Sequence, residues 1–284
     1  LHRTSRRQRQ MCIRDRPILV DPLITAIGWR NVYLVFAGIV LLVLLPIIYL
    51  FVVNTPEEIN QHKDNELNAE TTEILEDPLP MKDFFKYKSF WFISLAFALQ
   101  FFSMGGVLLH LIPHATNLGF EAIWNVLGFP LKQTVFAYSL AAFGGVIVKI
   151  FFGYLIDRIQ DNRPVMIMMF MQAMGIFGLT IVETFDLFLI SCFIFGLGFG
   201  GAMVLMSACF LKAFGSQNLG SVRGISAVII VPVQPLGIFI VGQAFDAGFY
   251  IQSFLLMGAA SIIALLVSSQ ISIQQKDNLS LQQQ

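Results

Sequence analysis

The chain has 284 residues, of which 56% are hydrophobic and only 13% are charged, and its mean hydropathy is +0.72. This composition excludes an ordinary soluble domain of the same length, so the lipid bilayer is the expected surrounding and partner. The formal net charge is zero and the charges form short clusters between apolar runs, which excludes a nucleic-acid-binding surface. The three cysteines, Cys12, Cys192 and Cys209, are too far apart for a disulfide framework or a metal site, and we expect the last two to be buried.

The first 16 residues contain six arginines and no apolar stretch, which excludes a signal peptide and a membrane span. We interpret residues 1–16 as a non-native basic leader; a native juxtamembrane tail is the alternative. Residues 17–27 are too short to cross a bilayer, since a spanning helix needs about 20 apolar residues. They are interpreted as the remnant of a helix that precedes the first complete span.

Seven later runs are long enough and sufficiently free of charge to cross the bilayer. Open sheets cannot satisfy their backbone in lipid, and these runs lack the alternation of barrel strands, so all are predicted to be helices. The sequence therefore predicts an all-α membrane protein. The predicted spans are Asn31–Val53, Ser89–Leu109 extending to about Ile112, Gln133–Ile156, Pro164–Val182, Leu187–Leu211, Gly224–Phe245 and Ala247 to about Ile271.

The lysines and arginines between the spans are unevenly distributed over the two sides. Only Arg30 and Lys132 lie on one side, whereas nine basic residues lie on the other: Lys63, Lys82, Lys86, Lys88, Arg158, Arg163, Lys212, Arg223 and Lys276. Because positively charged loops stay in the cytoplasm, the long linker and the C-terminal tail are predicted to be cytoplasmic. We expect a multi-pass protein of the plasma or inner (cytoplasmic) membrane.

Residues 54–88 form the one long polar segment, with nine acidic residues. We interpret this segment as a solvated cytoplasmic linker; an acidic docking segment for a basic partner is the alternative. The predicted organisation is a helix remnant and one span in residues 17–53, this linker, a six-helix bundle in residues 89–273 and a polar cytoplasmic tail in residues 274–284.

Several motifs occur in a defined order along these spans. Gly28, Trp29 and Arg30 precede the first span and the sequence TPEE follows it at residues 55–58. Later motifs are Gly153, Asp157, Arg158 and Arg163; Gly215–Gly224 with Arg223; and Pro235, Gly237, Gly242, Asp246, Gly248 and Tyr250. This order resembles the major facilitator superfamily. The resemblance implies a helical bundle in which the seven spans are equivalent to helices six to twelve, with the N-terminal bundle missing from the chain.

The resemblance also implies a gating motif at the turn after the third span, formed by Gly153, Asp157, Arg158 and Arg163. The glycine would allow close approach of a neighbouring helix, and the charges would form charge-assisted hydrogen bonds. Solvated helix-end charges are the alternative for Asp157 and Arg158. Residues 160–162 replace the glycine that the family usually has, so we expect Asn162 to adopt the left-handed conformation.

Lys149 is the only charge well inside a predicted span, ~12 Å before Asp157 and thus near the middle of the bilayer. An ammonium group there costs at least ~2.5 kcal/mol on insertion scales, so it needs a watered cavity or a partner. Two roles remain open for Lys149: binding of an anionic substrate, and an ion pair with a carboxylate of the missing bundle. The residues that share its helix face are small or polar: Tyr138, Ala142, Gly145 and Gly153.

Further polar residues lie in the second span. Gln100, Ser103 and His110 form a stripe, and Gly105 and Gly106 between them predict a broken outer half that acts as an outer gate. His110 is a candidate substrate ligand. Wetting by lipid headgroups at the outer interface is the alternative for His110 and for the nearby His114.

Three predictions concern packing. Pro232 and Pro235 predict a bend that would turn Gln234 toward a cavity. The glycines at 196, 198, 200 and 201 predict close helix packing rather than a phosphate-binding loop. The methionines from Met166 to Met174 are expected to face lipid.

Residues 110–119 and the single basic residue Lys149 resemble the monocarboxylate and oxalate/formate carriers. We therefore predict a secondary transporter of a small organic anion that works by alternating access and needs no cofactor, with proton or anion coupling through Lys149 or the missing helices. The alternatives are a carrier for a neutral or cationic solute and a non-transporting receptor or sensor on the same fold. An enzyme is disfavoured because no catalytic constellation or metal cluster lies at one depth. The predicted substrate-binding residues are Lys149, Tyr138, Gln100, Ser103, Gln234 and His110.

Overall fold

The structure, a computed structural model, describes residues 27–51, 79–126, 129–159 and 161–271. Within them, seven helices are long and apolar enough to cross a membrane, as the sequence predicts. The chain divides into two compact units, one of residues 16–78 and one that contains residues 79–284, and each is described by itself. The expected leader, the TPEE motif, most of the expected linker and the tail lie outside the described residues.

The described residues of the first unit form one long helix, made of α3 (Trp29–Ile39), the π-helical turn η1 (Val40–Leu44) and α4 (Leu45–Phe51). Gly28 precedes it with a φ of 76°, a left-handed conformation that glycine adopts without strain. Pro46 accounts for the π-helical turn, because proline lacks an N–H and its ring collides with the carbonyl group four residues earlier.

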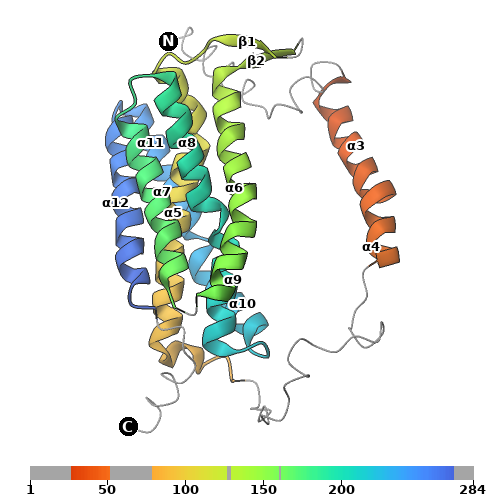
Figure 1. Cartoon of the computed structure of the whole chain (residues 1–284), viewed down its shortest axis with the longest axis vertical. Coiled ribbons are helices and arrows are strands. Elements are labelled where there is room, and N and C mark those ends of the chain that lie inside the picture. Colours follow the sequence, from red (N-terminus) through yellow and green to blue (C-terminus); the bar gives the residue numbers. More distant parts are fainter. Residues whose placement is uncertain (1–26, 52–78, 127–128, 160, 272–284) are drawn as a thin grey trace. The chain divides into compact units, whose positions relative to one another are not determined.

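Between residues 79 and 271, the described part of the second unit contains six membrane-length helical segments (Figure 1). They are α5 (Lys88–Asn117), α6 (Gln133–Arg158), α7 (Arg163–Thr180), α8 (Phe185–Gly200) with α9 (Ala202–Phe214), α10 (Leu219–Ile230) with α11 (Val233–Asp246), and α12 (Tyr250–Ser268). These bounds agree closely with the predicted spans. An antiparallel hairpin of β1 (Ile123–Val126) and β2 (Phe129–Lys132) joins α5 to α6; strands of 4 residues are too short for the sequence pattern to predict.

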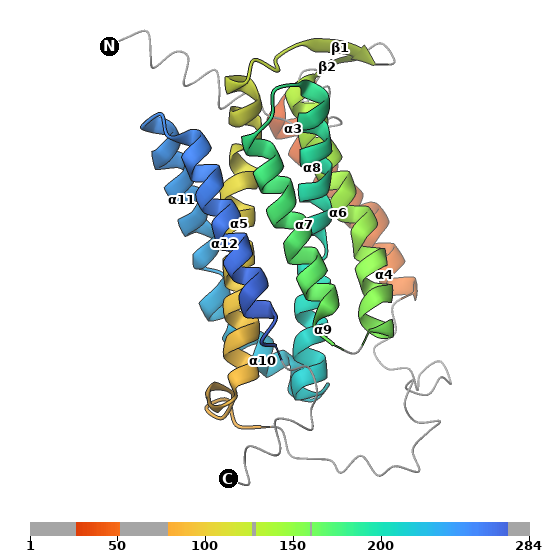
Figure 2. The same ribbon diagram turned by 60° about the vertical axis from the view of Figure 1, so that its left-hand side comes forward.

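The helices pack side by side in the order α6, α8, α7, α12, α5, α11 (Figures 1 and 2). We call the end that contains the hairpin the hairpin end. The opposite end is the basic end, because seven described lysines and arginines lie there, in loops or near helix ends: Lys82, Lys86, Lys88, Arg158, Arg163, Lys212 and Arg223. At the basic end, α9 contacts α5, α6 and α10.

Glycines allow α8 to pack closely on both of its neighbours, as predicted. A Cβ atom at Gly196 or Gly200 would collide with the backbone of α6, and one at Gly198 would collide with the backbone of α7. The glycines therefore serve helix packing, which in a membrane depends on close approach of backbones.

Two spans are interrupted. α10 ends at Ile230 and α11 begins at Val233, so the helix is interrupted at Pro232, as predicted, whereas α11 continues through Pro235. The interruption between α8 and α9 at Gly201 is not predicted. A Cβ atom at Gly201 would collide with the ring of Phe152 on α6, so this close contact favours a glycine at the interruption.

The break predicted within α5 is wrong. α5 continues through Gly105, Gly106 and Pro113. The two glycines pack against neighbouring helices instead: a Cβ atom at Gly105 would lie 2.7 Å from Cγ of Gln234, and one at Gly106 would lie 2.8 Å from the sulfur of Met257. An outer gate formed by a broken α5 is therefore excluded in this structure.

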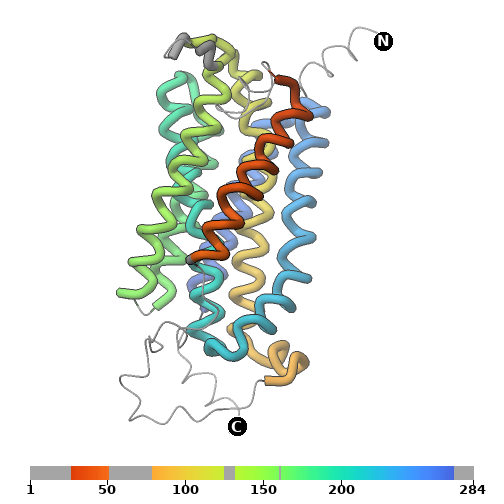
Figure 3. The backbone as a smooth tube through the Cα atoms, turned by 90° about the vertical axis from the view of Figure 1, so that its right-hand side faces the viewer, coloured from red at the N-terminus to blue at the C-terminus, as the bar shows by residue number. Residues whose placement is uncertain are grey.

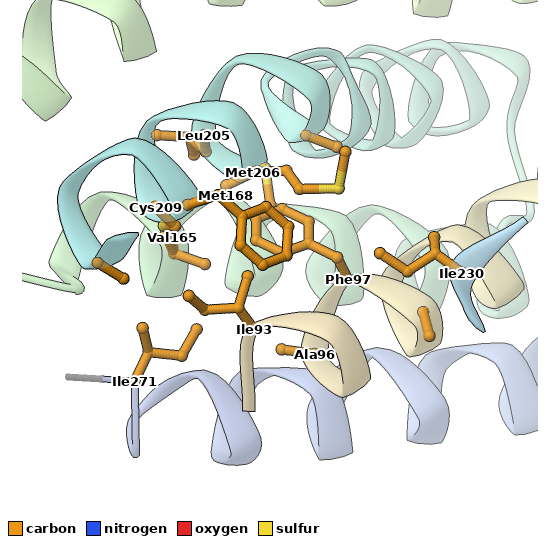
Figure 4. Close-up of a cluster of buried hydrophobic side chains, with 14 of the residues drawn as sticks. Ile93, Ala96, Phe97, Val165, Met168, Leu205, Met206, Cys209, Ile230 and Ile271 are labelled. Atoms are coloured by element: carbon orange, nitrogen blue, oxygen red, sulfur yellow. The ribbon is translucent and has the colours of Figure 1, made fainter. Parts of the chain in front are cut away.

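The core at the basic end joins α5, α7 and α9 (Figure 4). The prediction that the methionines face lipid is wrong for Met168 and Met169, which are fully buried; flexible thioether side chains fill irregular core space well. Cys192 and Cys209 are buried, as predicted. The core side chains labelled in Figure 4 are Ile93, Ala96, Phe97, Val165, Met168, Leu205, Met206, Cys209, Ile230 and Ile271.

Candidate functional site

The surface of α6 that does not pack on α8 is divided into two flanks. One flank presents bulky apolar side chains, including Phe143, Ile147 and Ile150, all exposed. The other flank, which we call the Lys149 flank, consists of Ala142, Val146, Lys149 and Gly153. Bulky apolar groups suit lipid, whereas small residues around a charge suit a cavity or a further helix.

Lys149 is exposed, and no ion pair of its ammonium group occurs within the described residues. The carboxylates described in the second unit lie in loops or at helix ends: Asp83, Glu121, Asp157, Asp161, Glu183, Asp186 and Asp246. In this part of the chain the positive charge therefore has no counterion at its own depth.

The predicted stripe around Lys149 is only partly maintained. Tyr138 is half-buried and lies nearer the hairpin end on the same side of α6. Gly145, in contrast, is buried: a Cβ atom there would lie 3.4 Å from the ring of Phe199 and 3.5 Å from Cα of Gly200. Gly145 thus contributes to the packing of α6 on α8 rather than to the exposed flank.

Gln100 and Ser103 lie in a polar cluster inside the bundle, which we call the glutamine cluster: Gln100, Ser103, Gln172 and Ser261. All four side chains are fully buried. Nε2 of Gln172 donates to the carbonyl oxygen of Gln100 (3.1 Å) and to Oγ of Ser103 (2.7 Å). Nε2 of Gln100 donates to Oε1 of Gln172 (2.5 Å), and Oγ of Ser261 donates to Oγ of Ser103 (2.8 Å).

The glutamine cluster connects α5, α7 and α12, so Gln100 and Ser103 face these helices and not the Lys149 flank. Neutral polar groups that satisfy one another in a dry interior favour a structural role. The sequence analysis missed Gln172. A lone amide within the apolar run of α7 is the signal that pointed to it.

His110 and Gln234 both lie between α5 and α11. Nδ1 of His110 is 2.9 Å from the carbonyl oxygen of Gly106, so it donates, and its ring lies 5.2 Å from the ring of Phe245. Gln234 is half-buried and packs on Gly105. Neither residue lies on the Lys149 flank of α6.

His114 is not wetted at an interface, contrary to expectation. Its ring is 1% exposed and stacks 4.6 Å from the ring of Phe254, and its Nε2 lies 2.8 Å from the carbonyl oxygen of Leu179. A carbonyl oxygen only accepts, so Nε2 donates. His114 therefore connects α5 to the end of α7 within the bundle.

The residues of the expected gating motif make the following contacts in the structure. Nε of Arg163 pairs with Oδ2 of Asp161 (2.8 Å), and the guanidinium of Arg158 lies 5.2 Å from the centre of the Tyr154 ring. Asp157 is exposed. A Cβ atom at Gly153 would meet nothing within 4 Å, so among the described residues no helix approaches it.

The expected left-handed conformation of Asn162 is wrong. Its φ is −81°, and its Nδ2 donates to the carbonyl oxygens of Ser268 (2.9 Å) and Ser269 (3.0 Å) at the end of α12. Lys212 makes a similar connection: its ammonium donates to the carbonyl oxygens of Ile156 and Ile159 at the end of α6. A lysine there also opposes the negative end of the helix dipole. The sequence analysis assigned Lys212 only to the charge asymmetry.

A comparison with protein families matches the model of the Major Facilitator Superfamily to residues 17–231, more than half of the chain. The chain belongs to this superfamily. No curated protein matches it. Because the family consists of membrane transporters, the protein is a multi-pass integral membrane protein of a transporter family and not of an enzyme family. Among the residues that the structure describes, no group of three potential metal ligands occurs.

Proposed function

We propose that this superfamily member moves a small organic anion by alternating access, and that Lys149 binds the anionic group. One observation carries the proposal: an exposed ammonium group near the middle of a span, with the small residues Ala142 and Gly153 on the same flank and no described carboxylate at its depth. Coulomb attraction is much stronger in a low-dielectric region than in water, so an uncompensated charge there favours a ligand of opposite sign.

The flank suggests how such a ligand would fit. Ala142 and Gly153 leave space beside the lysine stem, and the half-buried hydroxyl of Tyr138 lies toward the hairpin end. We propose that a second helical bundle covers this flank, so that the substrate lies between two bundles. Gly153, which no described helix approaches, then provides a contact point for the gating motif.

The polar residues of α5 and α11 divide into two groups under this proposal. Gln100 and Ser103 hold the bundle together, because both are hydrogen-bonded to Gln172 on α7, although Oε1 of Gln100 has no partner among the described residues. His110 and Gln234, which are only half-buried, remain candidates for substrate contact. Coupling to a proton or to a second anion then involves Lys149 itself or a carboxylate of the second bundle.

A binding screen with small organic acids on the purified protein tests the proposal. Lys149→Gln should weaken binding of the anion roughly 30-fold or more, because removing one partner of a desolvated charge pair costs about 2 kcal/mol or more. Lys149→Arg should keep most of the affinity, and the exposed Lys86→Gln at the basic end should keep all of it.

Unchanged affinity in Lys149→Gln would exclude the anion site. Binding of only a neutral or cationic solute would replace this proposal with the alternative carrier. The protein could also bind an anion without transporting it. If liposomes that contain the protein together with its second bundle do not take up the bound anion, the protein is a receptor.

A further inference from the structure

The segment Leu79–Trp91, which we call the elbow, is firmly packed on the bundle at the basic end (Figure 3). The backbone N–H of Leu79 donates to Oδ1 of Asn218 (2.9 Å). The ring of Phe84 is fully buried and lies 5.6 Å from the ring of Phe214, edge to face, and Tyr87 packs on the same ring. The elbow therefore has a fixed face on α9 and α10.

The opposite face of the elbow exposes large apolar groups. Met81 is 63% exposed, Phe85 45% and Trp91 48%. Nε1 of Trp91 donates to the carbonyl oxygen of Phe85 (2.9 Å), and the two rings lie 5.9 Å apart, so their orientation is fixed. This face lies directly beside the start of the span at Lys88, which is the depth of the membrane–water interface, where tryptophan and other aromatic rings are enriched.

The elbow is also basic, and its lysines are exposed. The elbow contains three lysines, Lys82, Lys86 and Lys88, and one acid, Asp83, so its formal charge is +2. Lys86 pairs with Asp83 (2.6 Å), and this hydrogen bond raises the pKa of Lys86. Lys82 and Lys88 are exposed and take part in no ion pair within the described chain. No acid occurs in the first turn of α5 to balance Lys88.

We propose that the elbow is a binding site for the anionic headgroup of a phospholipid in the leaflet at the basic end. Lys82 and Lys88 bind the headgroup phosphate, while Met81, Phe85 and Trp91 lie among the glycerol and upper acyl groups. An acidic protein segment would match the charge alone. The apolar groups beside the start of a span favour lipid, because that face meets the bilayer.

The test compares lipid binding by the full chain in nanodiscs of pure phosphatidylcholine and of an equimolar mixture with phosphatidylglycerol. Lipids that remain bound after mild detergent extraction are counted by native mass spectrometry. The wild-type protein should retain phosphatidylglycerol preferentially. The double variant Lys82→Gln/Lys88→Gln should lose roughly 25-fold in preference, about fivefold for each lysine near an anionic surface.

Arg223→Gln is the matched control, because Arg223 is exposed at the same end but lies outside the elbow. It should keep the preference for phosphatidylglycerol, and soluble glycerol phosphate should not displace the lipid. Equal retention of both lipids by the wild type, an unchanged preference in the double variant, or an equal loss in Arg223→Gln would overturn the proposal. Displacement by glycerol phosphate would also overturn it, since the site would then bind free phosphate groups.

Discussion

Gln100 of α5 and Lys149 of α6 are both polar residues inside apolar spans, but their surroundings are opposite. Gln100 is fully buried and bonded to Gln172, whereas Lys149 is exposed and has no counterion among the described residues. Neutral amides and hydroxyls can satisfy one another in a dry interior, but an ammonium group cannot be buried without a counterion. A polar residue in a span is thus an anchor when its hydrogen bonds close within the bundle, and a candidate binding group when they do not.

Replacing Gln172 by leucine tests the anchor and should have the largest effect on stability. The change removes the donors to Gln100 and Ser103 and leaves buried polar atoms unpaired. One interhelical hydrogen bond in a membrane protein averages about 0.6 kcal/mol and an orphaned buried group costs about 1–3 kcal/mol, so unfolding should become easier by about 2 kcal/mol. Denaturant unfolding in mixed micelles measures this difference.

The control for that variant is Ser207→Ala. The hydroxyl of Ser207 is not part of the glutamine cluster and donates only to the carbonyl oxygen of Met203 in its own helix (2.7 Å), so little change is expected. Equal effects of the two substitutions would show that the cluster does not anchor the bundle. Relative affinities for organic anions should be the same in both variants.

Most of the fold could be predicted because the bilayer sets the length and polarity of its helices. The bend at Pro232 was predictable for a local reason, the missing N–H of proline. The interruption at Gly201 was not, because no proline marks it and the sequence does not show that the ring of the distant Phe152 lies against this glycine. Continuity of α5 through Gly105 and Gly106 was missed for a related reason: α11 and α12 cover these glycines and hold the helix straight.

The part of the candidate site that could be predicted is the part that depends on one residue alone and not on a distant partner. Lys149 is conspicuous as one charge in a long apolar run. The pattern placed Gln100 on a helix face, but it could not show what covers that face, since its partner Gln172 is 72 residues away. Similarly, the sequence of the turn before α7 lacks the glycine usual in the family, so another residue had to form the turn. It gave no sign that Asn162 donates hydrogen bonds to the end of α12.

Asn162→Ala should have an intermediate effect, concentrated at the basic end. It removes two hydrogen bonds to Ser268 and Ser269, so a loss of about 1 kcal/mol is expected. Hydrogen exchange should accelerate at the last amides of α12, whose N–H groups bond within the final turn. Asn117→Ala, at the exposed end of α5, is the control and should leave exchange in α12 unchanged. Exchange that stays slow in Asn162→Ala would contradict the role of this contact.

Lys149→Leu should have the smallest effect on stability, and its sign separates the two roles that the sequence leaves open. If Lys149 is an uncompensated substrate group, no partner is left unpaired by the substitution, and the free energy of unfolding should be unchanged or slightly higher. If Lys149 instead pairs with a carboxylate of a second bundle, the substitution leaves a buried charge behind and should cost about 3–5 kcal/mol. Unfolding should therefore be measured both on this chain and on a chain that includes the second bundle. Val146→Leu, on the same flank, controls for added bulk. If the free energy of unfolding decreases only in the protein with both bundles, Lys149 forms a structural ion pair and the proposed anion site is wrong.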